Sequence, residues 1–121
     1  MQPDSSPNYR ILIVDDEPHL LNLLKGFITE DLGYTVAVTH NGAQALTLLT
    51  EFYPTHILTD HRMAGMTGVE LIEEIKLISP KTKILLMSGA AVADRLATKV
   101  GDDVIIISKP FDLSDLEAKL K

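Results

Sequence analysis

The sequence contains no cysteine, so structural disulfides and thiolate chemistry are both excluded. It also lacks a long apolar stretch: the longest runs hold only about five residues, far fewer than the roughly 20 that cross a membrane. Residues 1–8 are polar and include two prolines, which is unlike the apolar core of a secretory signal. We therefore expect a soluble, cytoplasmic protein that makes no contact with a membrane.

An excess of positive charge is absent as well. The 11 lysine and arginine residues are outnumbered by 17 aspartate and glutamate residues, which gives a formal net charge of −6. Because phosphate contacts require a basic surface, we expect no direct nucleic acid binding by this domain, although an acidic domain can be joined to a basic one. The length of 121 residues and the hydrophobic content of 45% predict one domain with a single core.

Short apolar runs alternate with segments in which apolar residues recur at helical spacing. Strands are expected at residues 10–14, 34–39, 55–59, 83–87 and 104–108. Helices are expected from Glu17-Pro18 to Gly33, from Asn41-Gly42 to Pro54, across 69–78, near 92–100 after a loop that begins at Gly89, and over 112–121. This alternation predicts an α/β fold with a doubly wound five-stranded parallel sheet and helices on both faces. Residues 1–9 are predicted to be a flexible N-terminal lead and residues 10–121 the domain.

Four of the expected strands run directly into residues that suit phosphate or metal chemistry. In chain order these residues are Asp15-Asp16, Asp60, Ser88 and Lys109. The ligand site of an open parallel sheet lies outside the carboxyl ends of its strands. We therefore expect these side chains, although far apart in the sequence, to converge on one edge of the sheet.

The three carboxylates would repel one another unless a cation or protons neutralised them. Oxygen ligands with no histidine or cysteine in register favour Mg²⁺, with Mn²⁺ as an alternative, over zinc. Lys109 and Ser88 could contact phosphoryl oxygens. Asp60 is the better candidate for a nucleophile that forms an aspartyl phosphate, because an open, glycine-containing loop follows it, whereas Asp15 and Asp16 would serve as metal ligands.

The four histidines show no spacing typical of metal ligands. We expect each of them to be a surface or loop residue: His19, His40, His56 and His61. Only His61, the neighbour of Asp60, is expected near the proposed site.

At this point the motifs indicate a family. The chain resembles the receiver domain of bacterial two-component response regulators over residues 10–121. The matching segments are ILIVDDEP at 11–18, DHRMAGMTG at 60–68, MSGA at 87–90 and SKPF at 108–111. The resemblance implies a flavodoxin-like fold and a signalling switch in a phosphorelay.

The resemblance also assigns roles to the residues of the predicted site. It implies that Asp60 accepts the phosphoryl group and that Asp16, Asp60 and the backbone carbonyl of Arg62 bind Mg²⁺ directly, with Asp15 acting mainly through water. Ser88 stands at the position of the switch residue, and Lys109 at that of the lysine that contacts the phosphoryl group. The donor is implied to be a phosphohistidine on a sensor histidine kinase or phosphotransfer protein, and the Lys109–Pro110 bond is implied to be cis.

Three departures from the family pattern affect these expectations. Ala64 replaces the usual proline in the loop after the acceptor, which should loosen the loop without touching the chemistry. Ile106 stands where an aromatic switch residue is typical, and it has no ring to swing inward when Ser88 moves. The Val100-Gly101-Asp102-Asp103 segment lies slightly earlier than its counterpart in the family, so the helix near 92–100 is the least certain element.

Output is expected through the face formed by the fourth helix, the fifth strand and the last helix. An exposed Ile106 on that face would suit an apolar partner, an output domain or a homodimer contact. Two other functions remain open. A Mg²⁺-dependent aspartyl-phosphate hydrolase typically carries a second aspartate two positions after the nucleophile, where this chain has Arg62. A degenerate receiver used only for binding would not need all five site residues. The sequence leaves open whether the regulator has a single domain or continues into an output domain.

Overall fold

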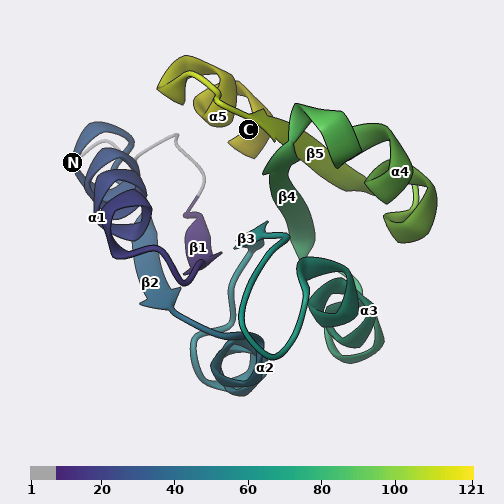
Figure 1. The fold of residues 1–121 in the computed structure, drawn as a ribbon. Helices are drawn as coiled ribbons and strands as arrows, with labels where there is room; N and C mark the ends of the chain where they lie inside the picture. Colours follow the sequence, from purple (N-terminus) through teal and green to yellow (C-terminus); the bar gives the residue numbers. More distant parts are fainter. Residues whose placement is uncertain (1–7) are drawn as a thin grey trace.

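The computed structural model describes residues 8–121, so residues 1–7 of the predicted lead lie outside the described part. In residues 8–121 the strands are β1 (Arg10–Val14), β2 (Thr35–Thr39), β3 (His56–Asp60), β4 (Lys83–Gly89) and β5 (Val104–Lys109). The helices are α1 (Pro18–Gly26), which continues as the π-helix η1 (Phe27–Asp31), α2 (Gly42–Glu51), α3 (Gly68–Ile78), α4 (Ala90–Val100) and α5 (Leu113–Leu120). Figure 1 shows the arrangement of these strands and helices.

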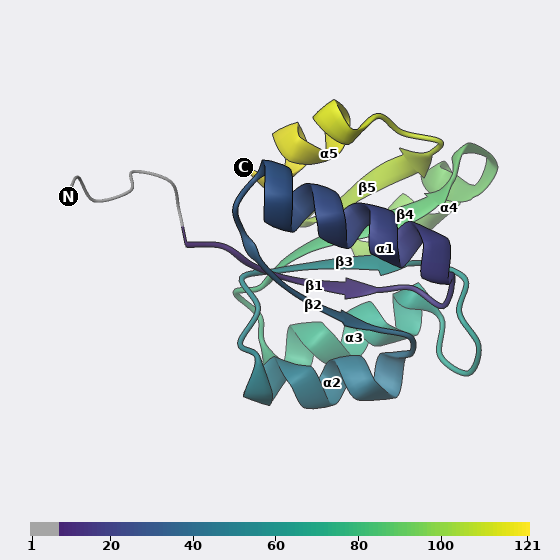
Figure 2. The same ribbon diagram turned by 90° about the vertical axis from the view of Figure 1, so that its left-hand side faces the viewer.

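The five strands form one parallel sheet in the order β2-β1-β3-β4-β5. Helices α1 and α5 cover one face of the sheet, and α2 and α3 cover the other (Figure 2). Helix α4 packs with α2 and α3, because its buried Leu96 and Val100 belong to the same core cluster. This arrangement confirms the predicted doubly wound α/β fold. It also explains the unbroken apolar runs: β3 is buried along its whole length because both of its faces are covered. No helix within residues 8–121 is both long and apolar enough to cross a membrane.

The helices begin at residues that satisfy their first backbone N–H groups. The Glu17 carboxylate accepts hydrogen bonds from the first turn of α1, whose first residue is Pro18, a position that needs no donor. Asn41 caps α2 through its side-chain oxygen. Thr67 and Glu70 bond reciprocally to each other's backbone N–H groups and form a capping box at the start of α3.

Two helices differ from the expectation. The sequence predicts a regular first helix up to Gly33, but the last turns before Leu32 form the π-helix η1 instead. The loop expected after Gly89 is wrong, because α4 begins immediately at Ala90. Alanine has the highest helix propensity, and the first four residues of α4 include three alanines, so the helix needs no connecting loop.

The prediction that every histidine lies on the surface or in a loop is wrong for His56. Its side chain lies within β3 and is only 4% exposed. The ring is 2.8 Å from the Thr55 hydroxyl through Nδ1 and 2.8 Å from the Leu120 carbonyl oxygen through Nε2. It also packs against Tyr9, whose ring centroid is 4.4 Å away. Because both ring nitrogens have partners, burial of this imidazole is tolerated.

His56 is expected to make the stability of the fold depend on pH. Burial lowers the pKa of the imidazole, and the charge of Lys83 lowers it further, while the bond to Leu120 opposes the shift. The unfolded chain then binds more protons than the folded one below about pH 6.5, the ordinary pKa of histidine, so stability falls as the pH decreases. Thermal unfolding between about pH 5 and 8 measures this effect.

The variant His56→Gln keeps a side chain that can donate to Leu120 but does not titrate. Below about pH 6.5, the melting temperature of the wild-type protein should fall as the pH decreases, and that of His56→Gln should fall much less. The exposed His40 serves as the control, and His40→Gln should retain the wild-type decline. Equal pH dependence in His56→Gln and the wild-type protein would show that this imidazole is not its source.

Candidate functional site

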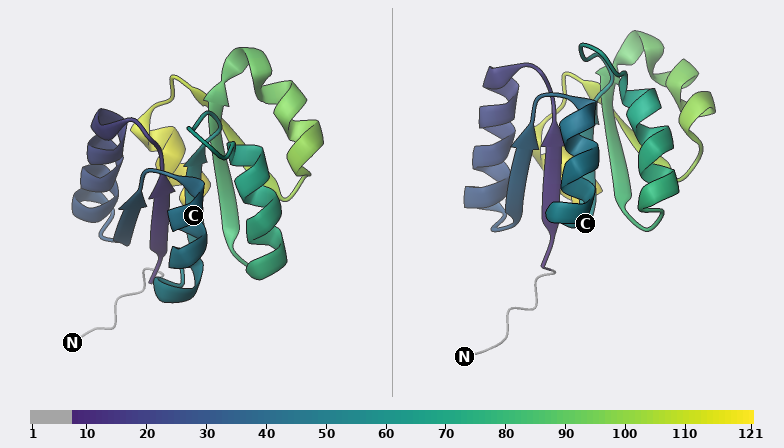
Figure 3. Two further views of the ribbon diagram at one scale, coloured as in Figure 1. Left: turned by 60° about the horizontal axis from the view of Figure 1, so that its bottom comes forward. Right: turned by 90° about the horizontal axis from the view of Figure 1, so that it is seen from below.

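The site lies at the carboxyl ends of β1 and β3, where the strand order reverses. The strand arrowheads visible in Figure 3 point to this end of the sheet, away from the N-terminus, and all five strands are parallel. Asp15 and Asp16 follow β1 directly, and Asp60 is the last residue of β3. One carboxylate oxygen from each of the three lies within 4.8 Å of the others. The fold thus brings together the three carboxylates that the sequence separates.

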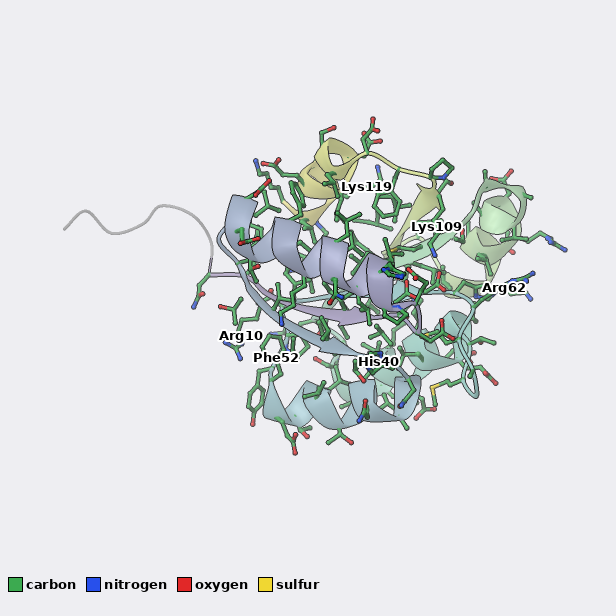
Figure 4. The ribbon with its side chains drawn as sticks, turned by 60° about the vertical axis from the view of Figure 1, so that its left-hand side comes forward. Arg10, His40, Phe52, Arg62, Lys109 and Lys119 are labelled. Atoms are coloured by element: carbon green, nitrogen blue, oxygen red, sulfur yellow. The ribbon has the colours of Figure 1, made fainter. Side chains whose placement is uncertain are left out.

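The other two predicted side chains reach the same edge from β4 and β5. The Lys109 ammonium lies 2.7 Å from Asp60 Oδ1. Ser88 is buried, and within residues 8–121 its hydroxyl has no hydrogen-bond partner. Both line a small cavity together with Asp60, His61, Arg62, Gly89 and Val92. Figure 4 shows Lys109 and Arg62 at this end of the molecule, with Arg10 and Phe52 at the opposite end.

The three carboxylates differ in their surroundings. Asp15 and Asp60 are buried, whereas Asp16 is exposed. Burial raises the pKa of the Asp15 carboxyl, the hydrogen bond from the Glu17 N–H lowers it, and the nearby charge of Asp60 raises it. A proton is therefore held more readily at this aspartate than at an ordinary one.

The donor set fits a divalent, oxygen-ligated cation. Asp15 Oδ1 accepts a hydrogen bond of 2.9 Å from the Glu17 N–H, but Asp15 Oδ2 is buried without a partner within residues 8–121. A buried carboxylate oxygen without a donor is costly unless a cation engages it. Asp15, Asp16 and Asp60 would hold Mg²⁺, which would neutralise negative charge around a phosphoryl group. Arg62 lines the adjoining cavity, and its carbonyl as a further ligand stays a prediction.

Sequence reasoning missed two residues that shape the site. The Glu17 N–H orients Asp15, while the Glu17 side chain caps α1. Gly68 allows α3 to start close to Asp60: a Cβ at this position would lie 2.6 Å from the Asp60 carbonyl oxygen. Its N–H donates to the His61 carbonyl oxygen over 2.8 Å, which closes the intervening loop. Glu17 could have been found from the sequence, because it directly precedes Pro18 at the start of a predicted helix. The close approach at Gly68 could not, because it depends on the tertiary fold.

Two points raised by the sequence concern β5. The Lys109–Pro110 bond is cis, as the resemblance implied. The apolar contact suggested for Ile106 depended on its exposure, and the side chain is half-buried and packs against the core cluster that includes residues of α3 and α4. In the sheet, Ile106 lies opposite the buried Leu86 of the neighbouring strand β4.

Comparison with known proteins identifies a family and several relatives of this chain. The family model "Response regulator receiver domain" matches residues 11–121. The sporulation initiation phosphotransferase F of Bacillus subtilis is 30% identical over 115 residues, which cover 94% of this chain and 92% of that protein. The transcriptional regulatory protein ZraR of Escherichia coli is 34% identical over 116 residues, which cover 94% of this chain but 26% of that protein.

Solved structures show the same fold. The receiver domain of the sensor histidine kinase PA1611 from Pseudomonas aeruginosa has a TM-score of 0.82 at 24% identity, with 94% of this chain and 95% of that chain covered. That crystal structure has a magnesium ion coordinated in its active site cleft. This chain spans nearly all of the Bacillus subtilis relative but only 25% to 46% of several transcriptional regulators that it matches.

The buried acidic cluster is expected to destabilise the protein when no divalent cation is bound. Replacing Asp15→Asn removes a buried negative charge that Asp60 and Asp16 repel, while the amide oxygen can still accept from Glu17. In a chelating buffer near neutral pH, we expect the free energy of unfolding to rise by about 1 kcal/mol. Urea unfolding measures the change.

The exposed Asp94 on α4 provides a matched control, because Asp94→Asn removes the same charge outside the cluster. That variant should leave stability within about 0.5 kcal/mol of the wild-type value. If Asp15→Asn were no more stable than the wild-type protein, the account of mutual repulsion in the cluster would be wrong.

Proposed function

The chain belongs to the receiver-domain family of response regulators, and we propose that Asp60 is the residue that accepts the phosphoryl group, with Mg²⁺ or Mn²⁺ bound beside it. The donor is a phosphohistidine on a cytoplasmic sensor kinase or phosphotransfer protein. The observation that carries this proposal is that the Asp60 carboxylate lies both within 4.8 Å of ligand oxygens of Asp15 and Asp16 and 2.7 Å from the Lys109 ammonium. The product is a modified protein, so the domain acts as a switch and not as a metabolic enzyme.

The reaction transfers a phosphoryl group from a histidine nitrogen of the donor to a carboxylate oxygen of Asp60. An Asp60 carboxylate oxygen attacks the phosphorus atom, the P–N bond breaks, and the imidazole nitrogen keeps the electron pair and takes up a proton. The Lys109 ammonium, which donates to Asp60 Oδ1, is close enough to form an ion pair with a phosphoryl oxygen once Asp60 is modified. The unpartnered Ser88 hydroxyl can donate to another phosphoryl oxygen. A bound Mg²⁺ would supply the remaining positive charge.

The same contacts suggest how phosphorylation changes the domain. Ser88 ends the buried part of β4, and Lys109 ends β5, so both strands gain a new partner when Asp60 is modified. We propose that this shifts the face formed by α4, β5 and α5 between two arrangements, and that an output domain or partner protein, or a second copy of the chain, reads that face. Ile106, which packs inward, would move with the core and not as a swinging ring.

The donor protein is proposed to dock on the apolar groove between α1 and the segment after β5. Leu20, Leu23, Phe111 and Leu113 line this groove. Lys109 lines both this groove and the cavity at Asp60, so a protein in the groove would present its phosphohistidine beside the acceptor. The rival function as a hydrolase is disfavoured by Arg62, which stands where a second aspartate would act as an acid or base.

The acceptor is tested by intact mass. After incubation with acetyl phosphate and Mg²⁺, we expect the wild-type chain to gain the mass of one phosphoryl group and Asp60→Ala to gain none. Asp94→Asn is the control and should be labelled like the wild-type protein. Labelling of Asp60→Ala would contradict the proposal, and so would an unlabelled wild-type protein that binds Mg²⁺. Multiple turnover of unrelated phosphate esters would favour the hydrolase.

The docking groove is tested by comparing two donors. Leu23 is 55% exposed in the groove, and Leu23→Ser should slow transfer from a phosphorylated histidine kinase by about tenfold, because apolar contact area is lost. Labelling by acetyl phosphate, which needs no docking surface, should remain within about twofold of wild type. Leu77→Ser is the control, since Leu77 is 79% exposed on α3 away from the groove. Equal losses with both donors, or equal losses in both variants, would refute docking at this groove.

A further inference from the structure

The segment 61–67, which joins β3 to α3, has a defined shape. Its ends are held together by the hydrogen bond from the Gly68 N–H to the His61 carbonyl oxygen. At its tip, the Met66 N–H donates to the Ala64 carbonyl oxygen over 3.1 Å. Gly65 lies between them at a φ of +87°, a conformation that glycine adopts without strain. The tip is therefore a tight turn whose position is set by the backbone.

This tip contacts two other parts of the molecule. On one side, the Ala64 N–H donates to Asp16 Oδ2 over 3.4 Å, across 48 residues of sequence. On the other side, Met66 packs onto Gly42, the first residue of α2, so closely that a Cβ there would lie 2.7 Å from the Met66 sulfur. The 61–67 segment thus connects a carboxylate of the acidic cluster to the start of α2.

The bond to Asp16 matters because this carboxylate is the exposed one of the three. An exposed aspartate is free to turn its oxygens toward solvent, and a fixed donor limits that freedom. A carboxylate accepts about four hydrogen bonds or metal contacts, so it can bind an N–H and a cation at once. Carboxylates that bind metals are usually oriented by such hydrogen bonds, and loss of these bonds commonly weakens metal binding.

We propose that the Ala64 N–H is a positioning donor that orients Asp16 for the metal, and that metal occupancy is thereby transmitted through the 61–67 segment to the start of α2. The inference rests on the proposed function, because it requires a divalent cation at Asp15, Asp16 and Asp60. It also revises the expectation that alanine at position 64 only loosens the loop. Proline has no N–H and could not make this bond. By linkage, a segment that favours metal binding is itself held more firmly when the metal is bound.

The first test compares Mg²⁺ affinity by isothermal titration calorimetry. Ala64→Pro removes the donor, and its dissociation constant should be about three to ten times that of the wild-type protein. Ala64→Ser keeps the N–H and should restore an affinity within about twofold of wild type. Circular dichroism checks that each variant is folded. An Ala64→Pro protein that binds Mg²⁺ as tightly as Ala64→Ser would overturn the proposal.

Proline also restricts the backbone, so a second test follows the bond itself by NMR. During a Mg²⁺ titration of the wild-type protein, the amide resonances of Ala64 and Gly42 should shift with one common midpoint. Gly101, which precedes β5 at the opposite edge of the sheet, is the internal reference and should not shift. In Ala64→Pro at saturating Mg²⁺, the Gly42 shift should shrink to less than about half.

The outcomes separate this inference from the function on which it rests. A wild-type protein that binds no Mg²⁺ would contradict the metal site and this inference together. Mg²⁺ binding with an unmoved Ala64 amide, or with an equal Gly42 shift in Ala64→Pro, would contradict the transmission route alone.

Discussion

The concentration of negative charge at the junction of β1 and β3 is the constraint on which the site depends. Three carboxylates lie within 4.8 Å of one another, and two of them are buried. Lys109 offsets part of this charge through its 2.7 Å contact with Asp60. The fold maintains the arrangement because the parallel strands that carry these residues are packed on both faces, so the carboxylates cannot separate without disrupting the core. The resulting geometry suits the binding of a hard cation and of a phosphoryl group.

Much of this could be predicted from the sequence, because the signals are local. The unbroken apolar runs predict buried parallel strands, and the rule that ligands bind at their carboxyl ends brings Asp15, Asp16, Asp60, Ser88 and Lys109 together. The features that escaped prediction depend on distances between segments far apart in the sequence. His56 looks like an ordinary polar residue until the Leu120 carbonyl is known to lie beside it. The partial burial of Ile106 cannot be read from the sequence, because it depends on packing against a core cluster built from several elements.

The loop after Asp60 also shows that prediction from local sequence is limited. Replacement of a usual proline by Ala64 predicts only more backbone freedom when it is considered locally. In the folded chain, the backbone N–H that this replacement provides finds the Asp16 carboxylate. The two proposals therefore place the start of signal transmission at two positions around Asp60. One is the Ser88 and Lys109 pair at the ends of β4 and β5, and the other is the 61–67 segment that reaches α2.

The central claim is that Asp60, and not another carboxylate of the cluster, carries the phosphoryl group. Reductive trapping with borohydride after phosphorylation converts an aspartyl phosphate into homoserine, which peptide mass spectrometry then locates in the sequence. The account predicts homoserine at position 60, with Asp15 and Asp16 unchanged. Homoserine at position 15 or 16, or none at position 60 in a phosphorylated sample, would contradict it.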